Sequence, residues 1–128
     1  MLKYHFTIHI HFKSDIDLNF IENELSLKAS EKLSFSESSE NPKKAKILFK
    51  TESFSEKDVS GFFNEFVVEF QVIFQKINFL CKQFDGLSGL VVYFERYSSK
   101  AETKIDLNFE TLKILTNNDI YFDREYKI

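Results

Sequence analysis

Three histidines, His5, His9 and His11, alternate with other residues near the start of the chain. Side chains an even number of positions apart share one face of a strand, so an extended segment would bring these imidazoles together. Imidazole binds zinc, copper, iron or nickel, which makes a metal-dependent enzyme using this histidine face one alternative. No His-x-x-x-His helix, cysteine pair or carboxylate at fixed spacing completes the set. We therefore expect no metal, no cofactor and no enzymatic activity.

Nucleophilic chemistry has weaker support. Gly86-Leu87-Ser88-Gly89 lacks the Gly-x-Ser-x-Gly spacing that holds a serine on a strained strand-to-helix turn. The single cysteine, Cys81, falls at the edge of the apolar side of a predicted helix, where an inert buried thiol is expected. The sequence thus predicts no covalent catalysis.

Hydrophobic periodicity predicts the elements that would position these residues. Strict alternation predicts a strand over residues 3–12, and i, i+3, i+4 spacing predicts one long helix over residues 55–84 with Ser55 as its N-cap. The other predicted elements are a helix over 20–28, strands around Leu33–Phe35 and Ile47–Phe49 joined by a turn at Asn41-Pro42, a strand over 90–97, a helix after Asn108 and a strand over 120–126.

The pentapeptide Ile-Asp-Leu-Asn-Phe occurs twice, at residues 16–20 and 105–109. Each copy lies where an alternating segment gives way to a helical pattern. Asparagine is a favoured N-cap because its side-chain oxygen accepts a backbone N–H of the first turn. The repeat therefore predicts two helix starts, with Asn19 and Asn108 as the caps.

The predicted order, β-α-β-β-α-β-α-β, indicates an α+β fold in a single domain over residues 1–128. Its first six elements have the connectivity of a ferredoxin-like β-α-β-β-α-β sandwich, extended here by one helix and one strand. In such a fold the helices cover one face of a mainly antiparallel sheet, and the other face stays open.

The open sheet face is the predicted binding surface. If the helices cover Phe6, Ile8 and Ile10, alternation sends the polar residues of the strands to the opposite face. Tyrosine with mixed charge is typical of a protein-binding surface, although antiparallel sheets also leave one face simply solvated. RNA-binding sandwiches share the architecture, but the Lys/Arg-Gly-Phe/Tyr-Gly/Ala-Phe signature is missing. The predicted partner-binding residues are His9, Tyr93, Tyr97, Tyr121, Asp123 and Glu125.

The long helix carries a second, thinner apolar line. Gly61, Val68, Val72 and Phe79 fall together, opposite the predicted core stripe. This line would either pack on the last helix or form a structural homodimer through Val68, Val72 and Phe79.

Composition limits the partners and the compartment. Seventeen basic and 20 acidic residues give a formal charge of -3, which argues against nucleic acid as a partner. The longest dense apolar run, Leu90–Phe94, is far below the roughly 20 residues that span a bilayer, so no membrane association is expected. One cysteine and an N-terminus without a secretory apolar region predict a cytoplasmic protein.

The second half of the chain resembles a bacterial domain family of unknown function that includes immunity proteins of polymorphic toxin systems. The likeness covers residues 47–126: the step from Ile47 to Glu56, the strand Leu90–Phe94, the segment Ile105–Glu110, and the closing Phe122, Asp123 and Tyr126. The resemblance implies a protein that neutralises a partner such as a toxin by occluding it, with no catalytic residues to carry over.

Overall fold

The computed structural model describes residues 2–35 and 44–126, so the turn predicted at Asn41-Pro42 lies outside the described residues. The described residues form five strands, four α-helices and a short 3-10 turn. In chain order they are β1 (Lys3–Phe12), α1 (Leu18–Leu25), β2 (Glu31–Phe35), β3 (Lys44–Lys50), α2 (Val59–Glu69), α3 (Gln71–Phe84), β4 (Gly86–Arg96), η1 (Lys100–Thr103), α4 (Phe109–Asn117) and β5 (Ile120–Tyr126).

The strands form one sheet in the order β2-β3-β1-β4-β5. Neighbouring strands are antiparallel except β4 and β5, which are parallel. The predicted α+β class is confirmed. The sheet is mixed, and its five-strand order differs from that of a four-stranded ferredoxin-like sheet.

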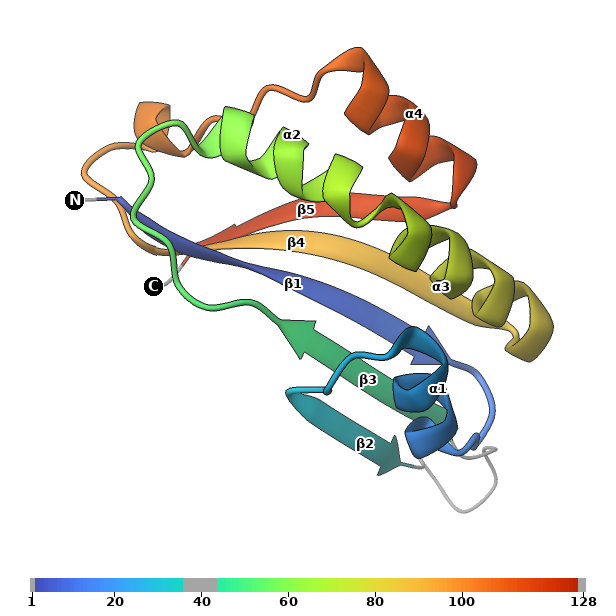
Figure 1. The fold of residues 1–128 in the computed structure, drawn as a ribbon. Coiled ribbons are helices and arrows are strands. Elements are labelled where there is room, and N and C mark those ends of the chain that lie inside the picture. The colour runs from blue at the N-terminus through green and yellow to red at the C-terminus, as the bar shows by residue number, and fades with distance from the viewer. Residues whose placement is uncertain (1, 36–43, 127–128) are drawn as a thin grey trace.

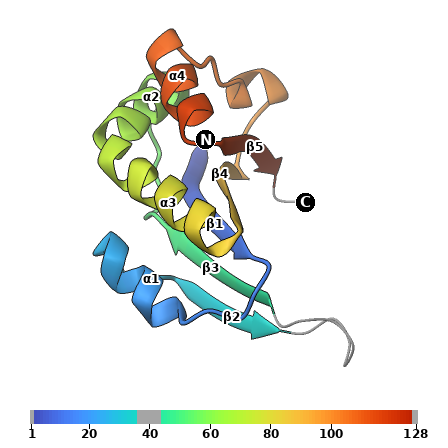
Figure 2. The same cartoon turned by 90° about the vertical axis from the view of Figure 1, so that its right-hand side faces the viewer.

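All four helices lie on the same side of the sheet in the two perpendicular views (Figures 1 and 2). The sheet face beneath them carries the apolar residues of β1, and Phe6, Ile10 and Phe12 there are almost fully buried. Phenylalanine rings fill the space between the layers: Phe6 lies 4.8 Å from Phe66 and 5.4 Å from Phe63, measured between ring centroids. Tilted and edge-on ring pairs of this kind add to the stability that area burial already supplies.

The two copies of the pentapeptide begin their helices at different positions. Asn108 caps α4 as predicted, and its side-chain oxygen accepts the N–H of Thr111 at 2.8 Å. The cap of α1 is Asp17 instead of Asn19, because the helix begins at Leu18 and buries that residue against the core. In the second copy, the side-chain oxygen of Asn64 in α2 accepts the backbone N–H of Asn108. This hydrogen bond keeps the chain extended up to the cap.

The helix predicted over residues 55–84 is two helices, α2 and α3, that meet at Phe70. It also begins later than predicted, with Asp58 as its cap, because Phe54 still exchanges backbone hydrogen bonds with Tyr4 of β1. The break gives α2 and α3 separate apolar sides toward the twisted sheet. Their buried residues are Val59, Phe63, Phe66 and Val67 in α2, and Phe74, Ile77, Leu80 and Cys81 in α3.

Neither of these helices, nor any other helix among the described residues, has both the length and the apolar character needed to cross a membrane.

Candidate functional site

The sheet face turned away from the helices is here called the open face. Strand pairing sets its rows: His9 of β1 lies opposite Leu48 of β3 and Gly89 of β4, and Gly89 lies opposite Tyr121 of β5. By the same alternation, the open face also carries His5, Thr7, His11, Lys46, Lys50, Leu87, Val91, Tyr93, Glu95, Asp123 and Glu125.

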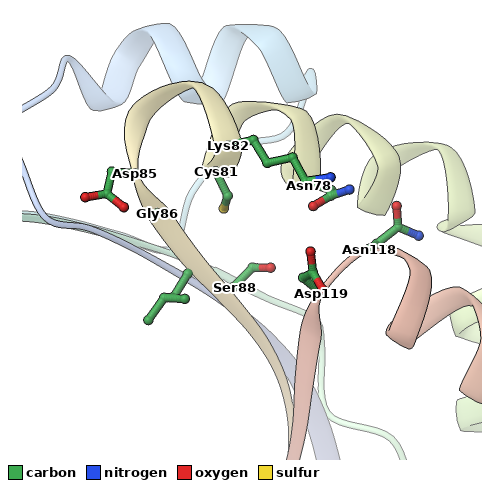
Figure 3. Close-up of a pocket in the computed structure, with 9 residues that line it drawn as sticks. Asn78, Cys81, Lys82, Asp85, Gly86, Ser88, Asn118 and Asp119 are labelled. Carbon is green, nitrogen blue, oxygen red and sulfur yellow. The ribbon is translucent and has the colours of Figure 1, made fainter.

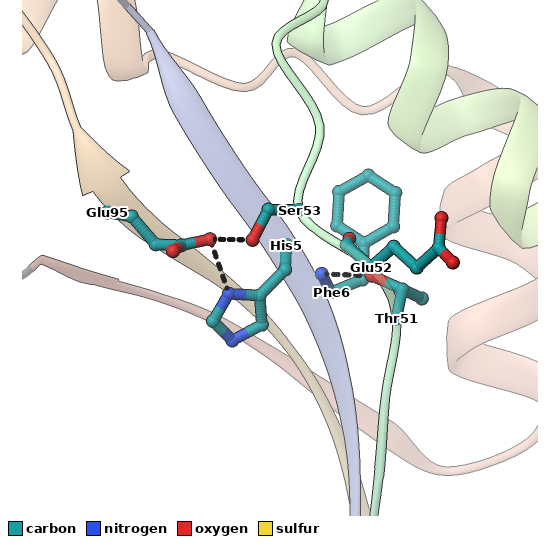
Figure 4. A network of polar contacts seen from close by, with 6 residues as sticks. All are labelled: His5, Phe6, Thr51, Glu52, Ser53 and Glu95. Atoms are coloured by element: carbon teal, nitrogen blue, oxygen red, sulfur yellow. Dashed lines mark hydrogen bonds and ion pairs between the residues drawn. The ribbon is translucent and has the colours of Figure 1, made fainter.

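His5 is buried in a polar network at one end of this face (Figure 4). Its ring stacks on Tyr93 at 5.1 Å, and its Nδ1 lies 3.0 Å from a carboxylate oxygen of Glu95. Ser53, from the segment after β3, donates its hydroxyl to the same oxygen. These hydrogen bonds, from Ser53 first and then His5, hold the pKa of Glu95 below its ordinary value.

This network is not arranged for nucleophilic catalysis. In a serine triad the imidazole accepts the serine proton, so the two side chains must be hydrogen-bonded to each other. Here the carboxylate of Glu95 accepts hydrogen bonds from both Ser53 and His5, and Ser53 is not bonded to the imidazole. The network ties the ends of β1 and β4 to the segment that leaves β3, which is a structural role.

His9 and His11 lie apart from His5, with their rings nearly parallel and 6.3 Å apart. Partial burial, followed by the charges of Lys46 and His11, lowers the pKa of His9 to about 4. The pKa of His11 is lowered by the same two kinds of cause, burial and then Lys46. Both imidazoles are therefore neutral at pH 7. The described residues bring no three His, Cys, Asp or Glu side chains together in a metal-binding arrangement.

Tyr121 lies across Gly89. A Cβ atom at Gly89 would be 2.0 Å from Cζ of the tyrosine ring, so the ring occupies the space that any other residue would fill. Burial raises the pKa of Tyr121, with further contributions from the negative charges of Asp123 and Glu125. The ring is nevertheless 48% exposed. Gly89 was missed as a site residue, although a glycine inside a strand is a known sign of such a close approach.

Asp123 and Glu125 are exposed on β5, on the same side as Tyr121. Asp123 accepts the N–H of Arg124 at 2.7 Å, so this backbone group on the edge strand is already bonded. The predicted site residue Tyr97 does not join them. Its ring packs against Tyr126, which stacks on the core residue Phe94, and this places Tyr97 beside the core.

Charge divides the open face into two halves. Lys46 and Lys50 of β3 lie on one side of β1, which is here called the basic half although Glu31 of β2 also lies there. On the other side, β4 and β5 carry Glu95, Asp123 and Glu125 around Tyr93 and Tyr121, and these five residues are here called the acidic half. An exposed aromatic ring flanked by carboxylates is suited to bind a basic, partly apolar protein surface.

A separate polar cleft of about 700 Å³ lies where α3 ends, β4 begins and α4 turns into β5 (Figure 3). Asp85 and Asp119 adopt left-handed backbone conformations there, with φ of 55° and 53°. Cys81 borders the cleft, and burial raises the pKa of its thiol to about 11, against a smaller opposing effect of a hydrogen bond with Ser88. The thiol is protonated at neutral pH and is buried, as predicted. The remaining lining residues are Asn78, Lys82, Gly86, Leu87 and Asn118.

Comparison with known proteins finds no matching family model, no matching curated protein and no matching solved structure.

Proposed function

We propose that this protein binds another protein through the acidic half of its open face and acts as an inhibitor of immunity type, neutralising a partner such as a toxin by occlusion. The observation that carries the proposal is the placement of Tyr121. Its ring lies over Gly89, the residue remains 48% exposed, and two exposed carboxylates follow it on the same side of β5.

The two kinds of side chain have different roles in this proposal. Interface energy concentrates in a few aromatic anchors that are desolvated on binding, and Tyr121 is positioned for that role with little freedom to lose. Charges around such an anchor mainly accelerate association with an oppositely charged partner. Asp123 and Glu125 would therefore steer a basic partner toward the ring.

The arrangement favours a protein partner over RNA. RNA-recognising sandwiches stack bases on aromatic rings of their central strands. Here Tyr121, an exposed ring of the open face, belongs to the edge strand β5, and the central strand β1 presents His5, Thr7 and His9. Tyr93 is half-buried against His5. We further propose that the protein acts in the cytoplasm.

We also propose that the elements from β1 to β4 form a ferredoxin-like unit, in which α2 and α3 together take the place of its second helix. Support comes from the order β2-β3-β1-β4, in which each neighbouring pair is antiparallel. The resemblance of residues 47–126 to a family that includes immunity proteins supports the inhibitory type of function.

The test uses the protein encoded by the adjacent gene as the candidate partner. Association and dissociation rates would be measured for Asp123→Asn combined with Glu125→Gln, and separately for Tyr121→Ala. We expect the charge variant to associate several-fold more slowly, with less dependence on salt. Tyr121→Ala should dissociate at least about tenfold faster, because anchor truncations act mainly on release.

Lys46→Gln combined with Lys50→Gln is the matched control, since it removes two charges from the basic half of the same face. Neither rate constant should fall in this variant. Wild-type kinetics for both acidic-half variants in an otherwise normal complex would place the interface elsewhere. Failure of the neighbouring protein to bind, or binding without inhibition of its activity, would contradict the inhibitory role.

A further inference from the structure

The helix layer bears an exposed apolar line on α2 and α3, on the opposite side of the molecule from the open face. Val68 at the end of α2 and Val72 and Phe79 on α3 form this line, here called the helix stripe. Val72 and Phe79 are seven residues apart on α3 and therefore share one side of that helix. Val72 is 61% and Phe79 67% exposed. Although α4 packs on α2, it leaves the stripe uncovered.

Charges are distributed unevenly along the stripe. Glu65 and Glu69 lie on the N-terminal side of Val72, and Lys76 lies on its C-terminal side. Within the part of the chain that the structure describes, none of these three groups forms an ion pair. Glu24 of α1 lines a groove together with Val72, Lys76 and Phe79, so a carboxylate also borders the end that carries Lys76. Along α2 and α3 themselves, the charges run from acidic to basic around an apolar centre, a pattern that is complementary to itself when reversed.

A shallow groove of about 480 Å³ lies beside the acidic end, between α2 and the start of α4. It is lined by Gly61, Asn64, Glu65, Val68, Glu69, Asn108 and Glu110. The side chain of Asp58 already fills the space beside Gly61, so Val68 is the apolar side chain of this lining that a ring from outside could contact.

We propose that the helix stripe binds a second copy of this chain, with the two stripes antiparallel about a two-fold axis at Val72. A two-fold interface presents the same patch from both copies, so a residue before Val72 meets one equally far after it. Lys76 of each copy then lies beside Glu65 and Glu69 of the other. Phe79 meets the position of Glu65, where the groove opens.

Charge selects this orientation over a parallel one. Parallel stripes would place Lys76 against Lys76 and Glu69 against Glu69, and like charges facing each other at an interface are unfavourable. The antiparallel arrangement gives the same opposite-charge contacts twice, by symmetry. Because three apolar residues bury less than a standard interface of about 1,600 Å², we expect a dimer that dissociates in the micromolar range.

Sedimentation velocity of the whole protein across a range of concentrations tests the proposal. The wild-type protein should shift from monomer to dimer as concentration rises. Lys76→Glu should weaken the dimer at least about tenfold, since it replaces two attractive contacts with two repulsive ones. Lys50→Glu, at an exposed position on the open face, makes the same change of charge on the opposite side of the molecule and should leave the dimer unchanged.

The orientation is tested by mixing. Lys76→Glu alone and Glu65→Lys with Glu69→Lys alone should each be monomeric, and an equal mixture of the two should form a heterodimer. Circular dichroism of each variant verifies that it is folded. Several hundred micromolar is about a hundred times a dissociation constant of a few micromolar. A wild-type protein that is still monomeric at that concentration would overturn the dimer. A dimer that Lys76→Glu leaves intact, or a mixture that does not associate, would overturn the antiparallel contacts.

Discussion

Gly89 and Tyr121 occupy neighbouring strands, and the missing side chain of one makes room for the ring of the other. The ring is thereby held against the sheet without being covered. This contact depends on a pair of residues distant in sequence, so the alternation that placed Tyr121 on the open face contained no information about it. Only the glycine inside an otherwise apolar strand pointed to a close approach.

Replacing Gly89 by alanine should displace Tyr121 while leaving the fold intact. The new Cβ would overlap the far end of a flexible side chain, which can rotate away, and not the backbone. Once the ring has moved into water, its raised pKa should fall toward the ordinary tyrosine value. A pH titration of the Tyr121 ring carbon by NMR measures this. A wild-type pKa in a folded Gly89→Ala protein would show that the contact does not hold the ring.

His9 gives a pH dependence of stability with a definite sign. Its pKa is lowered from the ordinary histidine value of 6.5 to about 4 in the folded protein, so the unfolded chain binds the proton more readily. The contribution of His9 to the free energy of unfolding is therefore fully present above pH 6.5. It is lost as the pH falls toward 4, by at most about 1.4 kcal/mol per pH unit.

Urea unfolding of the wild-type protein and of His9→Gln measures this contribution, because the carboxylates are common to both proteins and cancel in the difference. The variant should lose less stability than the wild type between pH 7 and pH 4.5. A difference between the two proteins that stays constant over this range would contradict the lowered pKa.

At the scale of elements, the repeated pentapeptide shows what local sequence can and cannot specify. Both copies start helices, as predicted, but the cap is the fourth residue in one copy and the second in the other. Burial of Leu18 moves the start of α1 forward, and the contact with Asn64 keeps the second copy extended. Local sequence thus specifies that a helix begins in this pentapeptide. Tertiary contacts decide which of its residues is the cap.

The two equivalent asparagines should therefore differ in their effect on stability. Asn108→Ala removes the cap of α4 and should lower the free energy of unfolding by about 1 kcal/mol. Asn19→Ala lies inside α1 and should change it by less than about 0.5 kcal/mol. Chemical denaturation of both variants compares the same substitution in the same pentapeptide. Equal losses would contradict the assigned caps.

The break between α2 and α3 is a second property that periodicity does not reveal. Apolar residues recur at helical spacing straight through Phe70, with no proline or glycine at the junction. The ring of Phe70 stacks on Phe66 at 4.4 Å and fills the space where the two helices meet. A straight helix would keep a single apolar stripe, whereas a twisted sheet requires the buried side to rotate along its length.

At the scale of the whole molecule, the two proposed surfaces lie on opposite sides of one sheet-and-helix sandwich (Figure 2). The α+β class and, apart from Tyr97, the predicted residues of the open face followed from alternation and element order, because these depend on local pattern. The distribution of charge across that face did not, since it depends on which strands are neighbours. Because β3 and β5 lie on opposite sides of β1 and β4, Lys46 and Lys50 are separated from Asp123 and Glu125.

The two proposed surfaces should function independently. Tyr121→Ala should leave the sedimentation of the protein unchanged, and Lys76→Glu should leave the kinetics of partner binding per chain unchanged. Residues this far apart with no shared contacts usually act additively. Measuring both properties for both variants and for the double variant tests this. Coupling between the effects would show that one surface depends on the other.

The strand made first, β1, pairs on both edges with strands made much later, β3 and β4. During synthesis, β1, which carries the rings of Tyr4, Phe6 and Phe12, therefore lacks its second neighbouring strand until β4 has left the ribosome. Pairings so distant along the chain form slowly, because the loop must close before any contact repays its cost. The newly made chain thus exposes one edge of a strand with a wholly apolar face until the segment that forms β4 has been made, and the sheet is completed only when the last third arrives.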